Sequence, residues 1–136
     1  MSFLLDTNVV SELRKARADP RVARWFRSIA SEDLHLSAVV IAELRRGVER
    51  IRRRDTAQAL HLEAWLTRVK DAFGPRILPL TLSIAEEWGR INVPDPLPIF
   101  DGLLVATARI HGLTLVTRDI ADLRRRGFPV FNPWAG

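Results

Sequence analysis

The sequence lacks cysteine entirely and has only two lysines among its 21 basic residues. Without cysteine the chain can form neither a disulfide framework nor a thiolate metal site, so any metal ion must be held by oxygen or histidine ligands. The same absence is typical of proteins that work in a reducing compartment, and we therefore expect a cytoplasmic protein.

Long hydrophobic runs are also missing from the chain. No apolar stretch approaches the roughly 20 residues that an α-helix needs to cross a bilayer. Near the N-terminus, Asp6 interrupts the apolar residues before the core of a signal peptide could form. We therefore expect a soluble protein with no membrane segment and no export through a signal peptide.

The composition is that of an ordinary globular protein, with 47% hydrophobic and 27% charged residues. A chain of this length suits one hydrophobic core, so we expect a single domain spanning residues 1–136. The formal net charge is +5, and every basic residue except Lys15 and Lys70 is an arginine. Because the planar arginine fork suits phosphate, the charge favours a partner rich in phosphate or carboxylate, without identifying it.

Short apolar runs and helical periodicities alternate along the chain. Ile41, Leu44 and Val48 recur at spacings of three and four, which indicates the buried face of a helix, and the three prolines within 93–98 predict a rigid loop. The predicted strands are 3–5, 34–36, 77–78 and 113–116. The predicted helices are 9–15, 20–29, 37–50, 55–73 and 99–111, with a further short helix after Asp119 that ends before Gly127. This alternation predicts an α/β three-layer sandwich with a central, mostly parallel sheet of about four to five short strands.

Three acidic residues occupy positions that such a sheet brings to one edge. Asp6 and Asp119 each follow the end of an apolar strand, and Asp101 opens the helix that leads into the second of these strands. Because sites in open parallel sheets form at the carboxyl ends of the strands, we expect the three carboxylates to converge. Glu43 is a fourth candidate, since it flanks the apolar face of its helix, where an unpaired carboxylate is costly.

These acids also have structural alternatives. The three at the sheet edge could cap helices or complement a helix dipole, and Glu43 could pair with Arg46 or Arg50 on the surface of its helix. Independent caps, however, have no reason to gather at one edge of a sheet. Crowded carboxylates repel one another unless a cation is bound, and hard divalent cations prefer carboxylate oxygens. The pattern as a whole therefore favours a metal site.

Four segments resemble the successive motifs of PIN domains, in the order and at the intervals of that family. They are Asp-Thr-Asn-Val-Val-Ser-Glu at 6–12, Ala-Glu-Leu-Arg-Arg-Gly at 42–47, Asp-Gly-Leu-Leu-Val-Ala-Thr-Ala at 101–108 and Leu-Thr-Leu-Val-Thr-Arg-Asp at 113–119. Among PIN domains, the chain most resembles the VapC toxins of bacterial VapBC toxin–antitoxin modules. The similarity extends from residue 3 to the C-terminal Phe-Asn-Pro-Trp at 131–134.

This resemblance implies a toxin that cleaves RNA endonucleolytically by metal-dependent phosphodiester hydrolysis. It implies that Mg²⁺ or Mn²⁺ is held by Asp6, Glu43, Asp101 and Asp119. Supporting roles fall to Thr7, Asn8 and Thr117. Many relatives have asparagine at the position of Asp119 and an acid three residues later, so Asp122 is an alternative fourth ligand. The resemblance also implies a homodimer and a higher complex in which a cognate VapB-type antitoxin enters the groove of the site.

Arginines gather in and just after the helix that carries Glu43. We predict that this group binds the RNA backbone, and the alternative is a solvated helix end that binds nothing. The group consists of Arg45, Arg46, Arg50, Arg52, Arg53 and Arg54.

Two other functions fit parts of the pattern. A phosphatase or receiver-like domain would use the acid after the first strand to accept a phosphoryl group. It would also need a second acid two residues later, where this chain has Asn8, or a lysine opposite the first acid. A non-catalytic, basic nucleic-acid-binding module would use the acids only as caps. A metal titration separates this second function from a nuclease, because caps do not bind Mn²⁺.

Overall fold

A computed structural model describes residues 1–135, and only Gly136 of the predicted domain lies outside the described residues. Five parallel strands form one sheet in the order β3-β2-β1-β4-β5. The strands are β1 (Phe3–Leu5), β2 (Leu34–Ser37), β3 (Ile77–Leu78), β4 (Thr114–Val116) and β5 (Val130–Phe131). The predicted α/β sandwich with a parallel sheet is confirmed.

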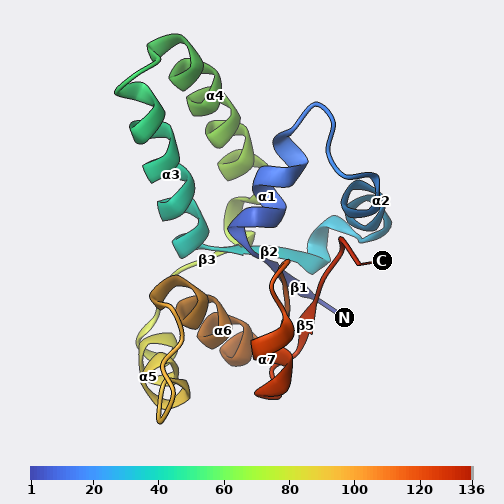
Figure 1. Cartoon of the computed structure of the whole chain (residues 1–136), viewed down its shortest axis with the longest axis vertical. Helices are drawn as coiled ribbons and strands as arrows, with labels where there is room; N and C mark the ends of the chain where they lie inside the picture. The colour runs from blue at the N-terminus through green and yellow to red at the C-terminus, as the bar shows by residue number, and fades with distance from the viewer. Residues whose placement is uncertain (136) are drawn as a thin grey trace.

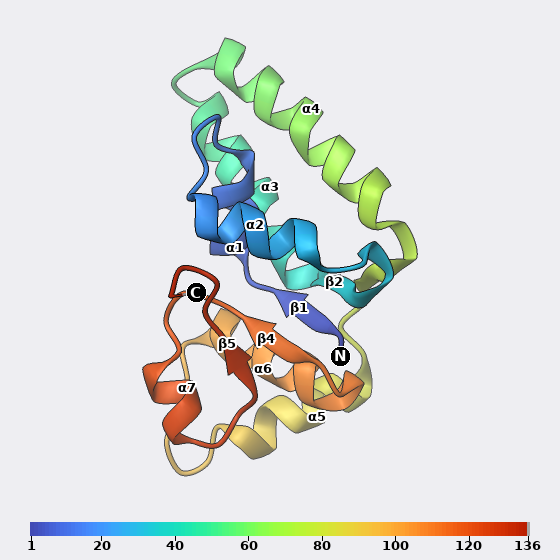
Figure 2. The same ribbon diagram turned by 90° about the vertical axis from the view of Figure 1, so that its right-hand side faces the viewer.

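Helices cover both faces of this sheet (Figures 1 and 2). On one face lie α1 (Thr7–Arg14), α2 (Pro20–Ser28), α3 (Ala38–Arg52) and α4 (Thr56–Phe73), of which α3 and α4 form a projecting hairpin. On the other face lie α5 (Leu82–Ile91) and α6 (Ile99–His111), and the short α7 (Ala121–Arg125) precedes β5. Two 3-10 turns, η1 (Ser31–Asp33) and η2 (Gly74–Arg76), lead into β2 and β3. Among these described helices, none combines the length and the apolar character needed to cross a membrane.

The central strands are buried because the sheet is covered on both sides, and their sequences are accordingly apolar throughout. Leu4 and Leu5 of β1, Leu36 of β2 and Val116 of β4 have no exposed surface. In the register of the sheet, Leu5 lies opposite Val116, so β1 and β4 end at the same level. The residues that follow these two strands are therefore brought to one edge.

Side-chain caps fix where five of the helices, α1 to α5, begin. Asp6 caps α1, Ser37 caps α3 and Thr81 caps α5, each by accepting a hydrogen bond from a backbone N–H of the first turn. Helix α6 ends at Gly112, whose φ of 66° is the left-handed conformation that glycine adopts at little cost. The predicted helices are confirmed, with boundaries that differ by one or two residues.

Two elements were not predicted, helix α5 and strand β5. Strand β5 has only two residues, and the nearby prolines at 129 and 133 favour a loop at this place in the sequence. Helix α5 does carry a signal, because Thr81 caps it and Ile84, Trp88 and Ile91 recur at spacings of four and three. Helix α5 was therefore predictable from the sequence between β3 and the proline-rich loop.

Candidate active site

Asp6 lies where β1 ends and is held from three sides. Its N–H donates to the carbonyl of Val116 at 2.9 Å, which ties it to the end of β4. Its Oδ1 accepts from the N–H of Thr7 at 2.6 Å, and its Oδ2 accepts from the hydroxyl of Thr117 at 2.7 Å. The capping role considered for Asp6 is therefore real, and it coexists with a position at the centre of the sheet edge.

Glu43 is linked to Asp6 through Thr7. The Thr7 hydroxyl donates to Glu43 Oε1 at 2.6 Å, so one residue at the start of α1 contacts both acids. Neither of the arginines considered as partners, Arg46 and Arg50, forms an ion pair with Glu43 in the part of the chain that the structure describes. Glu43 is half-buried, and its partner is a hydroxyl instead of a cation.

A cleft of about 360 Å³ gathers the other predicted acids at the same sheet edge. The predicted site residues that line it are Asp6, Asn8, Asp101, Thr117, Asp119 and Asp122. Glu43 lies beside this cleft and lines an adjoining groove of about 320 Å³, which it shares with Thr7. The structure thus places six of the eight residues assigned to the acidic site around one cleft, and the other two, Thr7 and Glu43, in the adjoining groove.

The electrostatics of the cleft are those of crowded like charges. Burial raises the pKa of Asp6, although hydrogen bonds from Thr117 and Thr7 lower it, and the charges of Asp101 and Glu43 raise it further. The pKa of Asp101 is also raised, first by partial burial and then by the charges of Glu43 and Asp119. Asp6 and Asp101 therefore lie close enough to neighbouring carboxylates to be affected by their charges.

The acids do not form a closed metal cage as they stand. Within residues 1–135, no group of three or more acidic or histidine side chains is spaced closely enough to hold a metal ion. Repulsion favours this spread arrangement, and hydrogen bonds already occupy both oxygens of Asp6 and one of Glu43. The four-carboxylate centre therefore stays a prediction, and it requires these side chains to move towards one another.

Asp119 and Asp122 differ in their partners. Asp122 accepts hydrogen bonds from Arg125 and Arg126, so ion pairs neutralise its charge. Asp119 has no ion pair among the described residues, and no side chain caps the N-terminus of α7, which leaves the capping alternative for Asp119 unsupported. The contacts favour Asp119 over Asp122 as the free carboxylate of the pair.

The predicted RNA-binding arginines fall into two groups. Arg45 and Arg52 both bind Glu49 on α3 and Glu63 on α4, and the bond from Arg45 to Glu63 is bidentate at 2.7 Å. This network lowers the pKa of Glu63 to about 2, chiefly through the hydrogen bond from Arg45. The members of the predicted group that form no ion pair within residues 1–135 are Arg46, Arg50, Arg53 and Arg54.

Helix α5 supports the turn that carries Asp101, a role that the sequence analysis missed together with the helix itself. Trp88 and Asn92 lie against Gly102, where a Cβ would approach Trp88 Nε1 to 3.0 Å and Asn92 Nδ2 to 3.3 Å. Asn92 is fixed in turn, because it donates to the carbonyl of Trp88 and accepts from the N–H of Leu97, both at 2.6 Å. The close approach of α5 to α6 therefore depends on glycine at position 102.

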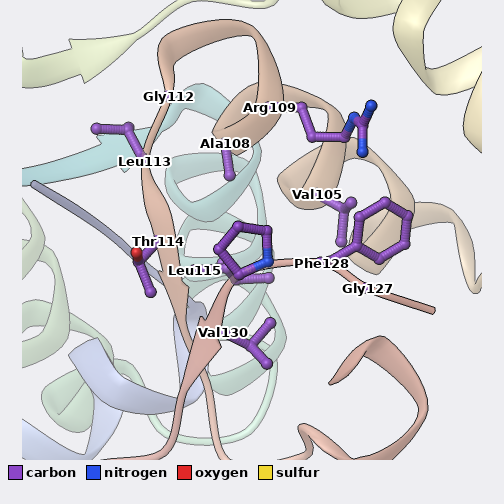
Figure 3. A pocket seen from close by; sticks show the side chains of 11 residues that line it. Val105, Ala108, Arg109, Gly112, Leu113, Thr114, Leu115, Gly127, Phe128 and Val130 are labelled. Carbon is purple, nitrogen blue, oxygen red and sulfur yellow. The ribbon is translucent and has the colours of Figure 1, made fainter. Parts of the chain in front are cut away.

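A larger cavity, of about 400 Å³, lies at the opposite edge, where β4 and β5 begin (Figure 3). Its walls are mostly apolar and include Val105, Leu113 and Val130. Its charged side chain, Arg109, lies over the ring of Phe128 and donates to Glu87 at 2.7 Å. No acid lines this cavity, so the larger hollow has none of the groups that hydrolysis needs.

Comparisons with known proteins match this fold. The PIN domain family matches residues 3–129. The toxin FitB of Neisseria gonorrhoeae is 36% identical over 137 residues, covering 97% of this chain and 98% of FitB. The VapC ribonuclease Y4jK of Sinorhizobium fredii is 34% identical and covers 97% of each chain. The crystal structure of FitAcB from Neisseria gonorrhoeae has a TM-score of 0.88 at 35% identity, covering 97% of this chain and 98% of that one.

Proposed function

The chain belongs to the PIN-domain family, among the VapC-type toxins, and on this basis we propose that it is a toxin that hydrolyses RNA endonucleolytically with a divalent metal ion. The observation that carries the proposal is the gathering of Asp6, Asp101 and Asp119 around one cleft, with Glu43 tied to Asp6 through Thr7. The relative Y4jK, a VapC ribonuclease, supports RNA as the substrate.

The residues present fit a hard divalent cation. Carboxylate oxygens are the donors that Mg²⁺ and Mn²⁺ prefer, and a cation would stabilise the charged forms of Asp6 and Asp101, whose pKa values are raised first by burial and then by neighbouring carboxylates. The ion would be held by Asp6, Glu43, Asp101 and Asp119, with Asp122 as the alternative to the last. When bound, the ion would lower the pKa of a water so that its deprotonated form can attack phosphorus at neutral pH, and it would neutralise charge on the phosphate.

The remaining work of the site falls to hydrogen bonds that orient the acids. Thr117 and the backbone of Thr7 fix the two oxygens of Asp6, and the Thr7 hydroxyl fixes Glu43. Asn8 lines the cleft beside them and adds a polar wall. No side-chain nucleophile is required, because water forms the new P–O bond in hydrolysis and the sugar leaves with a free hydroxyl group.

Binding of the RNA backbone is assigned to the arginines of α3 and its end. Those without an ion pair, Arg46, Arg50, Arg53 and Arg54, have donors available for phosphate. Arg45 and Arg52 contribute less in this proposal, since Glu49 and Glu63 already neutralise them.

We propose a cognate antitoxin as the natural inhibitor, in line with the relatives FitAcB and FitAB, the latter solved on a DNA fragment. The groove that starts at Thr7 and Glu43 continues between α1, α3 and α4 and has an apolar wall. An amphipathic segment in this groove would reach the acids and exclude RNA. The apolar wall consists of Leu44, Val48, Ile51, Leu62 and Trp65. A homodimer is proposed from the family resemblance, and sedimentation of the purified chain tests it.

The test combines cleavage with metal binding. The purified chain, without antitoxin, should cut RNA in Mg²⁺ or Mn²⁺ and not in EDTA, and Mn²⁺ should bind in calorimetry. Asp101→Asn should lose both cleavage and most of the Mn²⁺ affinity, because a ligand is deleted. The matched control is Asp71→Asn, which removes an exposed acid of α4.

The outcomes separate the competing functions. Cleavage that persists in EDTA, or in Asp101→Asn, would contradict the metal site. RNA binding with neither cleavage nor Mn²⁺ binding would instead support the non-catalytic basic module.

A further inference from the structure

Five arginines of the described chain lie over aromatic rings, and two of these pairs each include the residue that precedes an acid of the cleft. The guanidinium carbon of Arg46 lies 5.3 Å from the ring centroid of Phe100, the residue that precedes Asp101. That of Arg118 lies 5.0 Å from the ring centroid of Trp134, and Arg118 itself precedes Asp119. Each arginine is thus fixed next to a predicted ligand of the metal.

These two arginines are exposed and carry no ion pair. Across residues 1–135, ion pairs within 4.0 Å involve other basic residues, among them Arg45 and Arg109. A guanidinium over a ring keeps its N–H donors free at its rim, and the ring reduces the number of conformations that binding must remove. Arg46 and Arg118 are therefore held in place while their donors stay available.

The topology puts the two arginines on opposite sides of the cleft. Arg46 lies on α3, one turn beyond Glu43, and α3 follows β2. Arg118 follows β4 and contacts Trp134, which lies beyond the outer strand β5. In the sheet order β3-β2-β1-β4-β5, the strand that leads to Asp6 lies between β2 and β4.

An RNA strand that brings one phosphate to the acids must bring its neighbouring phosphates close to the same negative charge. We infer that Arg46 and Arg118 bind the phosphates on either side of the scissile one and so set the path of the RNA across the cleft. The inference rests on the proposed nuclease function and deepens it. Arg118 had no functional assignment from the sequence, because its ring partner is distant in the chain.

The experiment measures RNA binding separately from cleavage. The full chain is titrated against fluorescent oligouridine in EDTA, at several salt concentrations, by anisotropy. Arg46→Gln and Arg118→Gln should each weaken binding roughly three- to tenfold, the loss expected when a charge-assisted hydrogen bond is removed. The double variant should lower the log–log salt slope by about 1.4, since each phosphate contact to a single strand contributes about 0.7.

Two further variants make the result specific. Arg109→Gln removes a guanidinium that also lies over a ring, at the far edge of the sheet, and should bind RNA like the unmodified chain. Arg46→Lys with Arg118→Lys keeps the charges without the fork, and should retain the salt slope while losing affinity. If the arginines acted only by packing on their rings, the lysine and glutamine variants would not differ in salt slope.

Two results would overturn the inference, and a third would support the phosphate contacts while contradicting the nuclease proposal. The inference fails if the glutamine double variant has the affinity and salt slope of Arg109→Gln. It also fails if that double variant weakens only the antitoxin complex, because the arginines then serve a protein partner. If the salt slope falls as expected but the unmodified chain never cleaves RNA in Mn²⁺, the two phosphate contacts stand and the nuclease proposal is wrong.

Discussion

Both edges of the parallel sheet are hollow, but they treat charge in opposite ways. At the carboxyl edge, Asp6 and Asp101 have raised pKa values and no ion-pair partner in the described chain. At the amino edge, Arg109 is neutralised by Glu87, and the pKa of Glu87 is lowered by hydrogen bonds from Arg90 first and from Arg109. Unpaired charge is thus kept at one edge and avoided at the other.

The difference teaches where a site can be recognised in this fold. The amino-edge cavity is the larger, at about 400 Å³ against about 360 Å³, yet it is lined mainly by apolar residues. At the carboxyl edge the ends of β1 and β4 meet the N-terminus of α6, and among the leucines that line the cleft there lie four acids and the hydroxyl of Thr117. Strand direction, and not the volume of a cavity, locates the residues that can perform chemistry.

The largest expected effect appears when one substitution at the carboxyl edge is compared with one at the amino edge. Asp6→Asn should lower RNA cleavage more than about a hundredfold. Mutating a residue that only hydrogen-bonds to a metal ligand typically lowers activity about 10- to 100-fold, and loss of a ligand itself should lower it further. Asp6→Asn should not reduce the melting temperature of the metal-free protein, since it removes a repelling charge. Leu113→Ala at the amino edge, where Leu113 is 7% exposed, should cost about 2 to 5 kcal/mol of folding free energy.

Leu113→Ala should nevertheless retain its kcat below the melting temperature. The comparison of the two edges breaks down if Asp6→Asn cleaves normally, or if Leu113→Ala loses kcat while still folded.

The second prediction concerns which of the two acids after β4, Asp119 or Asp122, contributes to cleavage. Asp119→Asn should reduce kcat at least about tenfold more than Asp122→Asn, because Asp119 is free and Asp122 is held by Arg125 and Arg126. Both variants are assayed with the same RNA in Mn²⁺. Equal losses would mean that the acids share the ligand role, and the reverse order would identify Asp122 as the ligand.

A third prediction tests the support of the carboxyl edge by α5. Gly102→Ala should destabilise the protein by about 1 to 3 kcal/mol through crowding against Trp88 and Asn92, partly offset by about 1 kcal/mol of helix propensity. Cleavage should also fall, since Asp101 lies on the displaced turn.

The matched control is Gly89→Ala in α5, where a Cβ would meet nothing within 4 Å. That variant should gain stability by up to about 1 kcal/mol and keep its activity. Equal thermal unfolding temperatures for Gly102→Ala and Gly89→Ala would show that the contact between α5 and α6 has room to adapt.

Much of the fold could be predicted because its signals are local. The apolar runs 3–5 and 113–116 read as buried strands, and the spacing of Ile41, Leu44 and Val48 indicates the inner face of α3. Strand β5 could not be predicted, because prolines lie on both sides of its two residues and its pairing with β4 depends on the fold. The three apolar positions of α5 are present in the sequence, so this helix was predictable from a local signal.

The site was predictable to the extent that strand direction determines it. Asp6, Asp101 and Asp119 follow from the carboxyl-edge rule, and the structure places them around one cleft. The bond from Thr7 to Glu43 was beyond reach, because a side-chain contact between α1 and α3 has no local signature. The same holds for Arg118 and Trp134, whose contact depends on how the chain returns beside β4.

The smallest expected effect is a pH dependence at the amino edge. The pKa of Glu87 is lowered below its usual 4.5, so its ion pairs stabilise the fold above that pH, and the contribution is lost as pH falls through the lowered value. Glu87→Gln should therefore cost up to about 1 kcal/mol at neutral pH, the range of exposed ion pairs, and nothing in strong acid. Glu86→Gln, an exposed neighbour without an ion pair in the described chain, is the control. Urea unfolding at a series of pH values checks this, and a cost for Glu87→Gln that persists in strong acid would show that packing, and not charge, holds Glu87 against Arg109.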